Sequence, residues 1–261
     1  MEFQQKIHST ALIHPNSKIH PTVKIGAYSV VGENVQIDEG SEIGNFVTLT
    51  GNTIIGKGNK IYHYCSLGEA PQDKKFKNEK TYLSIGDGNT IREFCTFNVG
   101  TVDGGGRTQV GNNNWLMAYV HIAHDCKLEN DIVLANNSSL AGHVEIDDFA
   151  ILGGFTLVHQ FCKIGAHIIT AVGTIILKDI PPYVRAAGDN AKPNGINIEG
   201  LKRRNFSAQS ILDIKKAYKV IYREGNTIDT AKKMLLDLGK KTNEVNLFID
   251  FINKSNRGLI R

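Results

Sequence analysis

Residues 13–31 read IHPNSKIHPTVKIGAYSVV, with an isoleucine or valine at every sixth position. The same spacing begins at Ile7 and continues without a miss to Leu67. Eleven successive matches are far more than chance would place in a chain of this composition. The anchors of this run are Ile7, Ile13, Ile19, Ile25, Val31, Ile37, Ile43, Leu49, Ile55, Ile61 and Leu67.

The six-residue spacing returns in phase at Ile85, then slips by one residue and runs from Val110 to Ile176. A small residue or a valine often stands four positions after an anchor. A glycine often follows the anchor directly, as in Ile25-Gly26. We expect these glycines to allow a bend at each corner. A helix needs a period of 3.6 and a flat strand a period of 2. The pattern therefore predicts short strands joined by turns and stacked as a parallel β-solenoid.

The repeat resembles the hexapeptide-repeat family, an all-β solenoid in which three hexads form one triangular coil of a left-handed parallel β-helix. The left hand comes from this resemblance alone, because parallel crossovers in general are right-handed. We expect the β-helix to occupy residues 1–185, with insertion loops near 70–82 and 100–108.

The repeat ends after Ile180-Pro181-Pro182, and residues 186–261 are expected to form a C-terminal α-helical domain. Helical spacing covers about 206–223, 227–238 and 245–253. In the first of these, apolar residues follow a 3-4 rhythm on one face. Gly225, Asn226 and Thr227 predict a helix end followed by a new N-cap.

Composition limits the class of protein. The chain has 261 residues, of which 41% are hydrophobic, and a net charge of +4. This content supports a folded core, and the small positive charge permits an acidic partner without requiring a nucleic acid. The first residues lack the apolar run of a signal peptide, and the longest apolar stretch, 168–177, is too short to span a membrane. We therefore expect a cytoplasmic protein with no nucleic-acid partner and no membrane span.

The four cysteines follow the repeat, since each stands four residues after an anchor. We expect them to be buried structural residues, in preference to a thiol nucleophile or a metal thiolate. They are Cys65, Cys95, Cys126 and Cys162.

The histidines give the functional signal. His124, His143 and His159 belong to hexads that begin eighteen residues apart, which places them along one side of the solenoid with His121 and Gln160. Of the other five histidines, three near the N-terminal end are expected to be exposed corner residues, and His63 and His167 are expected to be structural. Three interpretations compete for the column: surface residues without a role, a metal site, and general base catalysis. Both insertions leave the coil on this side, and loops that leave a regular scaffold commonly carry function.

Four segments together resemble a narrower family, the acyl-carrier-protein-dependent UDP-N-acetylglucosamine O-acyltransferases of lipid A synthesis. They are His121-Ile122-Ala123-His124-Asp125-Cys126, Leu140-Ala141-Gly142-His143-Val144, Val158-His159-Gln160-Phe161-Cys162 and Asn197-Ile198-Glu199-Gly200-Leu201-Lys202-Arg203-Arg204. The resemblance implies a cytoplasmic homotrimer without a cofactor or a metal, with active sites between subunits. It also implies transfer of an R-3-hydroxyacyl group from acyl carrier protein to the glucosamine 3-hydroxyl of UDP-N-acetylglucosamine.

The resemblance assigns roles residue by residue. His124 would be the general base, Asp125 its orienting partner, and the N–H of Gly142 the oxyanion donor. A direct contact between the neighbours His124 and Asp125 requires a local bend, because consecutive residues of a strand point to opposite faces. The substrate-binding positions would be Asp73, Lys75, His121, His143, His159, Gln160, Asn197, Glu199, Arg203 and Arg204, with Arg203 binding the acyl-carrier-protein donor.

Val172 stands where some members of that family keep a glycine at the end of the acyl channel, so a shorter acyl chain is expected. The acyl length, and the choice between a 3-hydroxyl and a 3-amino acceptor, stay open. The alternatives are a zinc hydratase of the γ-carbonic-anhydrase type, acetyl transfer from coenzyme A, and a non-catalytic scaffold.

Overall fold

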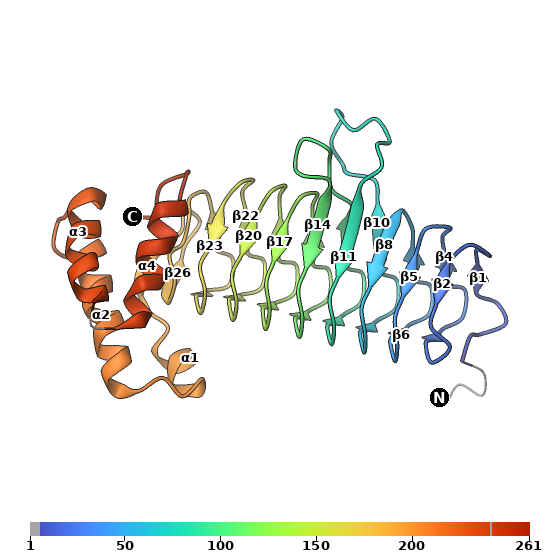
Figure 1. Cartoon of the computed structure of the whole chain (residues 1–261), viewed down its shortest axis with the longest axis horizontal. Coiled ribbons are helices and arrows are strands. Elements are labelled where there is room, and N and C mark those ends of the chain that lie inside the picture. The colour runs from blue at the N-terminus through green and yellow to red at the C-terminus, as the bar shows by residue number, and fades with distance from the viewer. Residues whose placement is uncertain (1–5, 241) are drawn as a thin grey trace.

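The computed structural model describes residues 6–240 and 242–261. The chain winds as a parallel β-helix of triangular cross-section, followed by a group of helices at its C-terminal end (Figure 1). Each coil contributes one short strand to each of three sheets, so strands three apart in sequence order are neighbours in space. The predicted solenoid is confirmed, and its coils are eighteen residues apart, as in the pairing of Leu12 with Val30.

Three sheets form the walls. The first contains β1 (Leu12–Ile13), β4 (Val30–Val31), β7 (Thr48–Leu49), β10 (Ser66–Glu69), β13 (Thr96–Asn98), β16 (His121–Ile122), β19 (Ser139–Leu140), β22 (Leu157–Val158) and β25 (Ile175–Ile176). The second contains β2 (Lys18–Ile19), β5 (Gln36–Ile37), β8 (Asn52–Ile55), β11 (Tyr82–Ile85), β14 (Arg107–Val110), β17 (Lys127–Leu128), β20 (Glu145–Ile146) and β23 (Lys163–Ile164). The third contains β3 (Lys24–Ile25), β6 (Glu42–Ile43), β9 (Lys60–Ile61), β12 (Thr90–Ile91), β15 (Trp115–Leu116), β18 (Val133–Leu134), β21 (Ile151–Leu152), β24 (Ile169–Thr170), β26 (Val184–Ala187) and β27 (Lys192–Ile196), the last antiparallel to β26.

The anchors of the repeat fill the inside of the prism. From Ile25 to Ile176 every one of them is buried, together with the small residues four positions later, such as Val35 and Ser41. A closed coil has little interior space, so a large residue must alternate with a small one. The four cysteines are buried and free, as predicted. Burial raises the pKa of the Cys126 thiol to about 12, which keeps it protonated and unreactive.

Both insertions leave the β-helix at the same corner, the turn from the first sheet to the second, which we call the insertion corner (Figure 1). Leu67 pairs with Phe97 thirty residues later, and Phe97 pairs with Ile122 twenty-five residues later. The first insertion therefore adds twelve residues, a multiple of six, and the second adds seven. This difference explains why the sequence repeat kept its phase across the first insertion and slipped by one residue across the second.

The bends differ from the expectation. Gly26 does not have a positive φ, and the left-handed conformation is taken two residues later by Tyr28, with φ 57°. Gly26 is required for a different reason, because a Cβ there would lie 2.6 Å from the carbonyl oxygen of Gly44 in the next coil. The glycines after the anchors thus allow close contact between coils. The bends are made by residues with positive φ three positions after an anchor, which are glycines such as Gly40 and Gly58 in some coils and non-glycine residues such as Tyr28 in others.

The corner between the third and first sheets carries a stack of aromatic rings at these bends. Neighbouring ring centroids are 4.8–5.2 Å apart and the rings are nearly parallel. The stack offsets part of the cost of the left-handed backbone conformation, since each ring packs on the ring of the next coil. Its members are Tyr28, Phe46, Tyr64, Phe94 and Tyr119.

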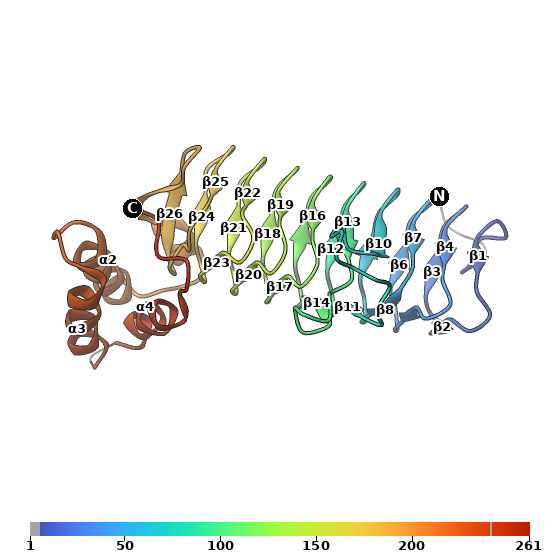
Figure 2. The ribbon, with the colours of Figure 1, turned by 90° about the horizontal axis from the view of Figure 1, so that it is seen from above.

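The C-terminal helices lie beyond the last coil, with α2, α3 and α4 grouped together (Figure 2). Their bounds are α1 (Ile198–Arg203), α2 (Ala208–Tyr222), α3 (Ile228–Gly239) and α4 (Asn243–Lys254). The last three match the predicted helices, and Thr227 is the N-cap of α3 as expected. The short helix α1 was not predicted, and the expected division between residues 185 and 186 falls within β26.

The end of the chain returns to the β-helix and closes it. The buried carboxylate of Asp179 accepts the Ser255 hydroxyl and the backbone N–H of Lys163. Ile260 donates its N–H to the Asp179 carbonyl at 3.0 Å. Within residues 6–240 and 242–261 no helix is long and apolar enough to cross a membrane.

Candidate active site

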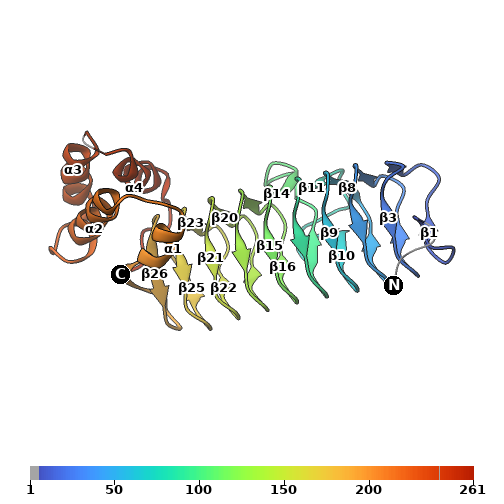
Figure 3. The ribbon, with the colours of Figure 1, turned by 90° about the horizontal axis from the view of Figure 1, so that it is seen from below.

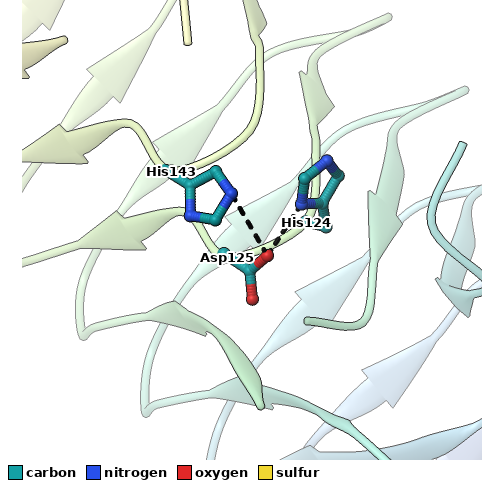
Figure 4. A group of neighbouring side chains, drawn as sticks. All are labelled: His124, Asp125 and His143. Carbon is teal, nitrogen blue, oxygen red and sulfur yellow. Dashed lines mark hydrogen bonds and ion pairs between the residues drawn. The ribbon is translucent and has the colours of Figure 1, made fainter. Parts of the chain in front are cut away.

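His124, Asp125 and His143 lie together at the insertion corner, where β16 and β19 of the first sheet lead into the second (Figure 4). Asp125 occupies the bend of its coil, with φ 62°, and His143 occupies the bend of the next, also with φ 62°. The column of left-handed residues at this corner is therefore polar at these two coils, and it continues with Phe161 in the next coil. The same conformation recurs at bends along the whole β-helix, so it is a property of the fold and does not by itself mark a functional site.

The bend at Asp125 brings two consecutive side chains together. The Nδ1 atom of His124 lies 2.7 Å from Oδ2 of Asp125. A carboxylate can only accept, so Nδ1 of His124 carries the proton and donates it. Nε2 of His124 is then left with a lone pair. An imidazole held in this tautomer by a carboxylate is the arrangement that general base catalysis requires.

The carboxylate of Asp125 is completely buried, and it is held by the second insertion as well as by His124. Thr101 donates its backbone N–H to Oδ1 at 2.7 Å and its hydroxyl to Oδ2 at 2.7 Å. The backbone N–H of Asp125 in turn donates to Oγ1 of Thr108 at 2.8 Å. With three donors, the charge of Asp125 is stabilised inside the protein and is available to stabilise a protonated His124.

Gly142 lies against the face of the His124 ring, one coil further on. A Cβ at this position would lie 2.6 Å from Cε1 and 2.8 Å from Nε2 of His124. Real Cβ atoms do not come so close, so only glycine lets the ring take this place. The backbone at 142 is thereby within reach of anything that His124 Nε2 contacts.

His143 extends the cluster toward the outside. Its ring is edge-on to His124, with centroids 5.2 Å apart, and its Nε2 lies 3.7 Å from Oδ2 of Asp125. On its other side it stacks on Phe161 of the next coil at 4.3 Å. Burial lowers the pKa of His143, while the negative charges of Asp125 and, more weakly, Asp73 oppose that shift. His143 is therefore mainly neutral at pH 7.

An open cavity of about 530 Å³ adjoins this cluster. Asp125, His143 and Phe161 form one side of it. The second insertion, the outward face of β14, β17, β20 and β23, and the C-terminal segment at Asn256 and Arg257 form the rest. Four cationic side chains line it, two of them paired with glutamates. They are Arg107, Lys127, Lys163 and Arg257.

His124, Asp125 and His143 are the one group of potential metal ligands found in the described part of the chain, with ligand atoms within 4.8 Å of one another. Both oxygens of Asp125 already accept hydrogen bonds, and Nδ1 of His124 is protonated. Only Nε2 of His124 and the ring of His143 are free to bind an ion. A catalytic zinc site takes three protein ligands, so the hydrogen bonds favour proton transfer over metal binding.

Comparison with known proteins places the chain in a family. A model described as UDP N-acetylglucosamine O-acyltransferase, domain 2, matches residues 179–260, and hexapeptide-repeat models match 6–39, 16–51 and 107–142. The chain is 55% identical to an acyl-[acyl-carrier-protein]--UDP-N-acetylglucosamine O-acyltransferase of Thiobacillus denitrificans, covering 98% of this chain and 99% of the relative. A protein of the same name from Herminiimonas arsenicoxydans is 52% identical, with 98% and 99% covered. The chain belongs to the UDP-N-acetylglucosamine O-acyltransferase family.

Solved structures of this acyltransferase family agree over the whole length. The Francisella novicida UDP-N-acetylglucosamine acyltransferase has a TM-score of 0.96 at 43% identity, covering 98% of this chain and 94% of that one. The Campylobacter jejuni protein has a TM-score of 0.93 at 36% identity, with 98% and 99% covered. The solenoid is therefore the left-handed parallel β-helix that the sequence resemblance implied.

Not all the positions matched to the acyltransferase family meet at this corner. Asn197 is buried at the turn from the second sheet to the third, where it donates to the His167 carbonyl and caps α1. Figure 3 shows α1 beside the C-terminal coils of the β-helix. Arg204 lies on the same corner, with its guanidinium 5.2 Å from the centre of the Phe149 ring. Glu199 and Arg203 are exposed on α1. These four residues are on a different edge of the prism from His124.

The remaining predicted residues lie in the first insertion, along the first sheet and, for Val172, at a different corner. Asp73 and Lys75 lie in the first insertion, where the Asp73 carboxylate accepts the Lys75 N–H. Nδ1 of His121 is 2.8 Å from the Thr96 hydroxyl, and burial lowers its pKa. His159 and Gln160 are exposed beside Phe161. Val172 lies at the corner between the third and first sheets, with 76% of its surface exposed.

Sequence reasoning missed three residues of the site. Phe161 follows His143 by eighteen residues, so the spacing of the coils was sufficient to find it. Thr101 and Thr108 stand at the ends of the second insertion, and no periodic signal places a loop residue against Asp125.

Proposed function

We propose that this protein is an enzyme that transfers an R-3-hydroxyacyl group from acyl carrier protein to the 3-hydroxyl of the glucosamine unit in UDP-N-acetylglucosamine. This is the first step of lipid A synthesis, and we place the enzyme in the cytoplasm, acting without a cofactor. The observation that carries the proposal is the hydrogen bond between His124 and Asp125, which leaves the lone pair of His124 Nε2 free. Asp125 and His143, the neighbours of His124 in the cluster, line the adjoining cavity. The names of the relatives supply the substrates.

The residues divide the reaction among them. His124 Nε2 removes the proton of the sugar 3-hydroxyl as its oxygen attacks the thioester carbonyl carbon. Asp125 stabilises the imidazolium that forms. The N–H of Gly142, which has no acceptor among the described residues, donates to the oxyanion. When the carbon–sulfur bond breaks, the imidazolium returns its proton to the carrier thiol, and the products are the sugar ester and free carrier.

Substrate binding needs the surrounding residues. In this proposal Asp73 and Lys75 hold the glucosamine, and His121, His143, His159 and Gln160 line the sugar-nucleotide and acyl pocket. Asn197, Glu199 and Arg204 contact the nucleotide, Arg203 contacts the donor, and Val172 limits the acyl chain. One amino group of the Arg204 guanidinium, Nη1, is buried without a hydrogen-bond partner among the described residues. An unpaired guanidinium N–H is suited to a phosphate oxygen.

We further propose a homotrimer in which each active site combines two subunits. His124 and Arg204 lie on different corners of one chain, so a neighbouring copy is needed to bring the two sets together. His124→Ala and Arg204→Ala variants, each inactive alone, should regain activity when coexpressed, because mixed trimers contain sites with both residues intact. Recovery that is absent in active, correctly assembled mixtures would contradict shared sites.

The activity is tested by mass spectrometry of UDP-N-acetylglucosamine incubated with metal-stripped enzyme and a panel of R-3-hydroxyacyl carrier proteins. We expect a 3-O-acylated product whose formation is lost in His124→Ala. The preferred chain length reports the length of the acyl channel. A preference for chains of 14 or more carbons would contradict the role of Val172. Product formed only with a 3-amino sugar would overturn the proposed acceptor.

A further inference from the structure

The second insertion folds directly over the Asp125 carboxylate. It makes a tight turn in which Gly104 and Gly106 both donate their N–H groups to the Thr101 carbonyl, at 3.2 and 2.7 Å. A Cβ on Gly104 would lie 2.0 Å from the Cγ atom of Asp125. Only a glycine at 104 lets the turn close this tightly, so the insertion is fitted to the carboxylate and is more than a tolerated loop.

Thr101 is the residue of this turn that bonds Asp125. Its backbone N–H and its hydroxyl reach different oxygens of the carboxylate, each at 2.7 Å. The hydroxyl also accepts the N–H of Gly104 at 3.2 Å, which orients its own hydrogen toward Asp125. Two bonds from one residue to the two oxygens fix the plane of the carboxylate as well as its position.

The orientation of Asp125 matters because two imidazoles compete for it. Oδ2 lies 2.7 Å from Nδ1 of His124 and 3.7 Å from Nε2 of His143. A carboxylate without the Thr101 bonds can rotate about its Cβ–Cγ bond and move this oxygen toward His143. The bond to His124 would then be lost, and with it the tautomer that leaves Nε2 of His124 unprotonated.

We propose that Thr101 is a positioning residue, which holds the Asp125 carboxylate toward His124 and so makes His124, and not His143, the base. This rests on the proposed function of the site. Thr101 acts through Asp125, without touching substrate. Loss of the hydroxyl therefore lowers the rate of the chemical step and leaves binding of the sugar nucleotide unchanged.

Three variants test this in the full-length enzyme. Thr101→Val removes the hydroxyl and keeps the shape and the backbone N–H, while Thr101→Ser keeps the hydroxyl. Thr156→Val is the matched control, because its buried hydroxyl donates to the Gly153 carbonyl at another corner. We expect Thr101→Val to lower kcat about 10- to 100-fold with little change in KM, as outer partners of catalytic groups do. Thr101→Ser and Thr156→Val should keep near-normal kcat.

A second measurement isolates the path of the effect. In an Asp125→Ala background, Thr101→Val should cause no further loss, because the group through which it acts is gone. A further loss of the same size would show that Thr101 acts independently, and would overturn the proposal. A normal kcat in Thr101→Val, with Asp125→Ala impaired, would overturn it while sparing the roles of His124 and Asp125. A normal kcat in Asp125→Ala would overturn the positioning role of Thr101 and also the proposed role of Asp125 in catalysis.

Discussion

Gly142 and His124 lie against each other from adjacent coils. The ring of His124 occupies the space that a side chain at 142 would need, since a Cβ there would lie 2.6 Å from Cε1. In the proposed mechanism the glycine serves two purposes at once, because it makes room for the His124 ring and offers its N–H to the oxyanion. Neither purpose is visible from a single coil, since each coil supplies only half of the pair.

Gly142→Ala should lower kcat by about 100-fold, since the new methyl group must displace the His124 ring by about 1 Å and such a shift misaligns the base. Stability should change little, because the site is at the edge of the core. Gly154→Ala is the control: its Cβ would have 3.4 Å to the nearest atom, the Asn136 carbonyl oxygen, and its φ is not positive. Equal kcat in the two variants would contradict the displacement.

Asp125→Asn should lower kcat about 10²- to 10⁴-fold while KM for the sugar nucleotide is nearly unchanged. The amide can present its NH₂ group to Nδ1 of His124, which stabilises the tautomer protonated at Nε2 and removes the lone pair that accepts the sugar proton. Steady-state kinetics separate the two parameters. A rise in KM with normal kcat would instead identify Asp125 as a binding residue.

Removal of metal ions should leave the acyltransferase activity intact. Nδ1 of His124 and both carboxylate oxygens of Asp125 already take part in hydrogen bonds, which leaves only Nε2 of His124 and the ring of His143 free to bind an ion. Enzyme dialysed against a chelator is assayed against untreated enzyme, and its bound zinc is measured by atomic spectroscopy. Activity that disappears on dialysis and returns with about one zinc per site would revive the zinc hydratase alternative.

The fold was predictable because the repeat depends on short-range geometry. Every coil must place an aliphatic residue such as Ile122 inside the prism, and a fixed number of residues separates one wall from the next, so periodicity in the sequence becomes periodicity in space. The histidine column followed from the same arithmetic. The glycines were misinterpreted because a bend and a close contact between coils both favour glycine, and only the φ values at Gly26 and Tyr28 distinguish them.

The site was predictable only in part. The contact between His124 and Asp125 depends on the positive φ of Asp125, and the sequence does not mark this position because no glycine stands there. The bonds from Thr101 depend on how an insertion of irregular length folds back on the coil. The placement of Asn197 on another corner depends on packing of α1 against the prism, a contact between segments thirty residues apart.

His167, at the corner between the second and third sheets, leads to a prediction about the pH dependence of stability that does not involve catalysis. Its ring is buried between Phe149 and Tyr183, with centroids 5.0 and 5.5 Å away, and its Nδ1 has no hydrogen-bond partner within the described residues. Burial, together with the positive charge of Arg204, lowers the pKa of His167 to about 4. An unfolded histidine titrates near pH 6.5.

The sign of the pH dependence follows from these two values. Between about pH 6.5 and pH 4 the unfolded chain binds a proton that the folded chain does not, so stability is complete above this window and is lost as the pH falls through it. The full loss is up to about 3 kcal/mol at 1.36 kcal/mol per pKa unit. His167→Phe keeps an aromatic ring at a bend where Phe149 and Phe161 are already tolerated, and it removes the titration.

Urea unfolding of the wild type and of His167→Phe at pH 7, 6, 5 and 4 checks this. The wild type should lose stability toward low pH more steeply than the variant, and the two curves should differ by the contribution of one group. A residual slope is expected in the variant, because burial also lowers the pKa of His121 and His143. Parallel curves would mean that His167 titrates alike in the folded and unfolded chains, which its stacked and unpaired ring does not allow.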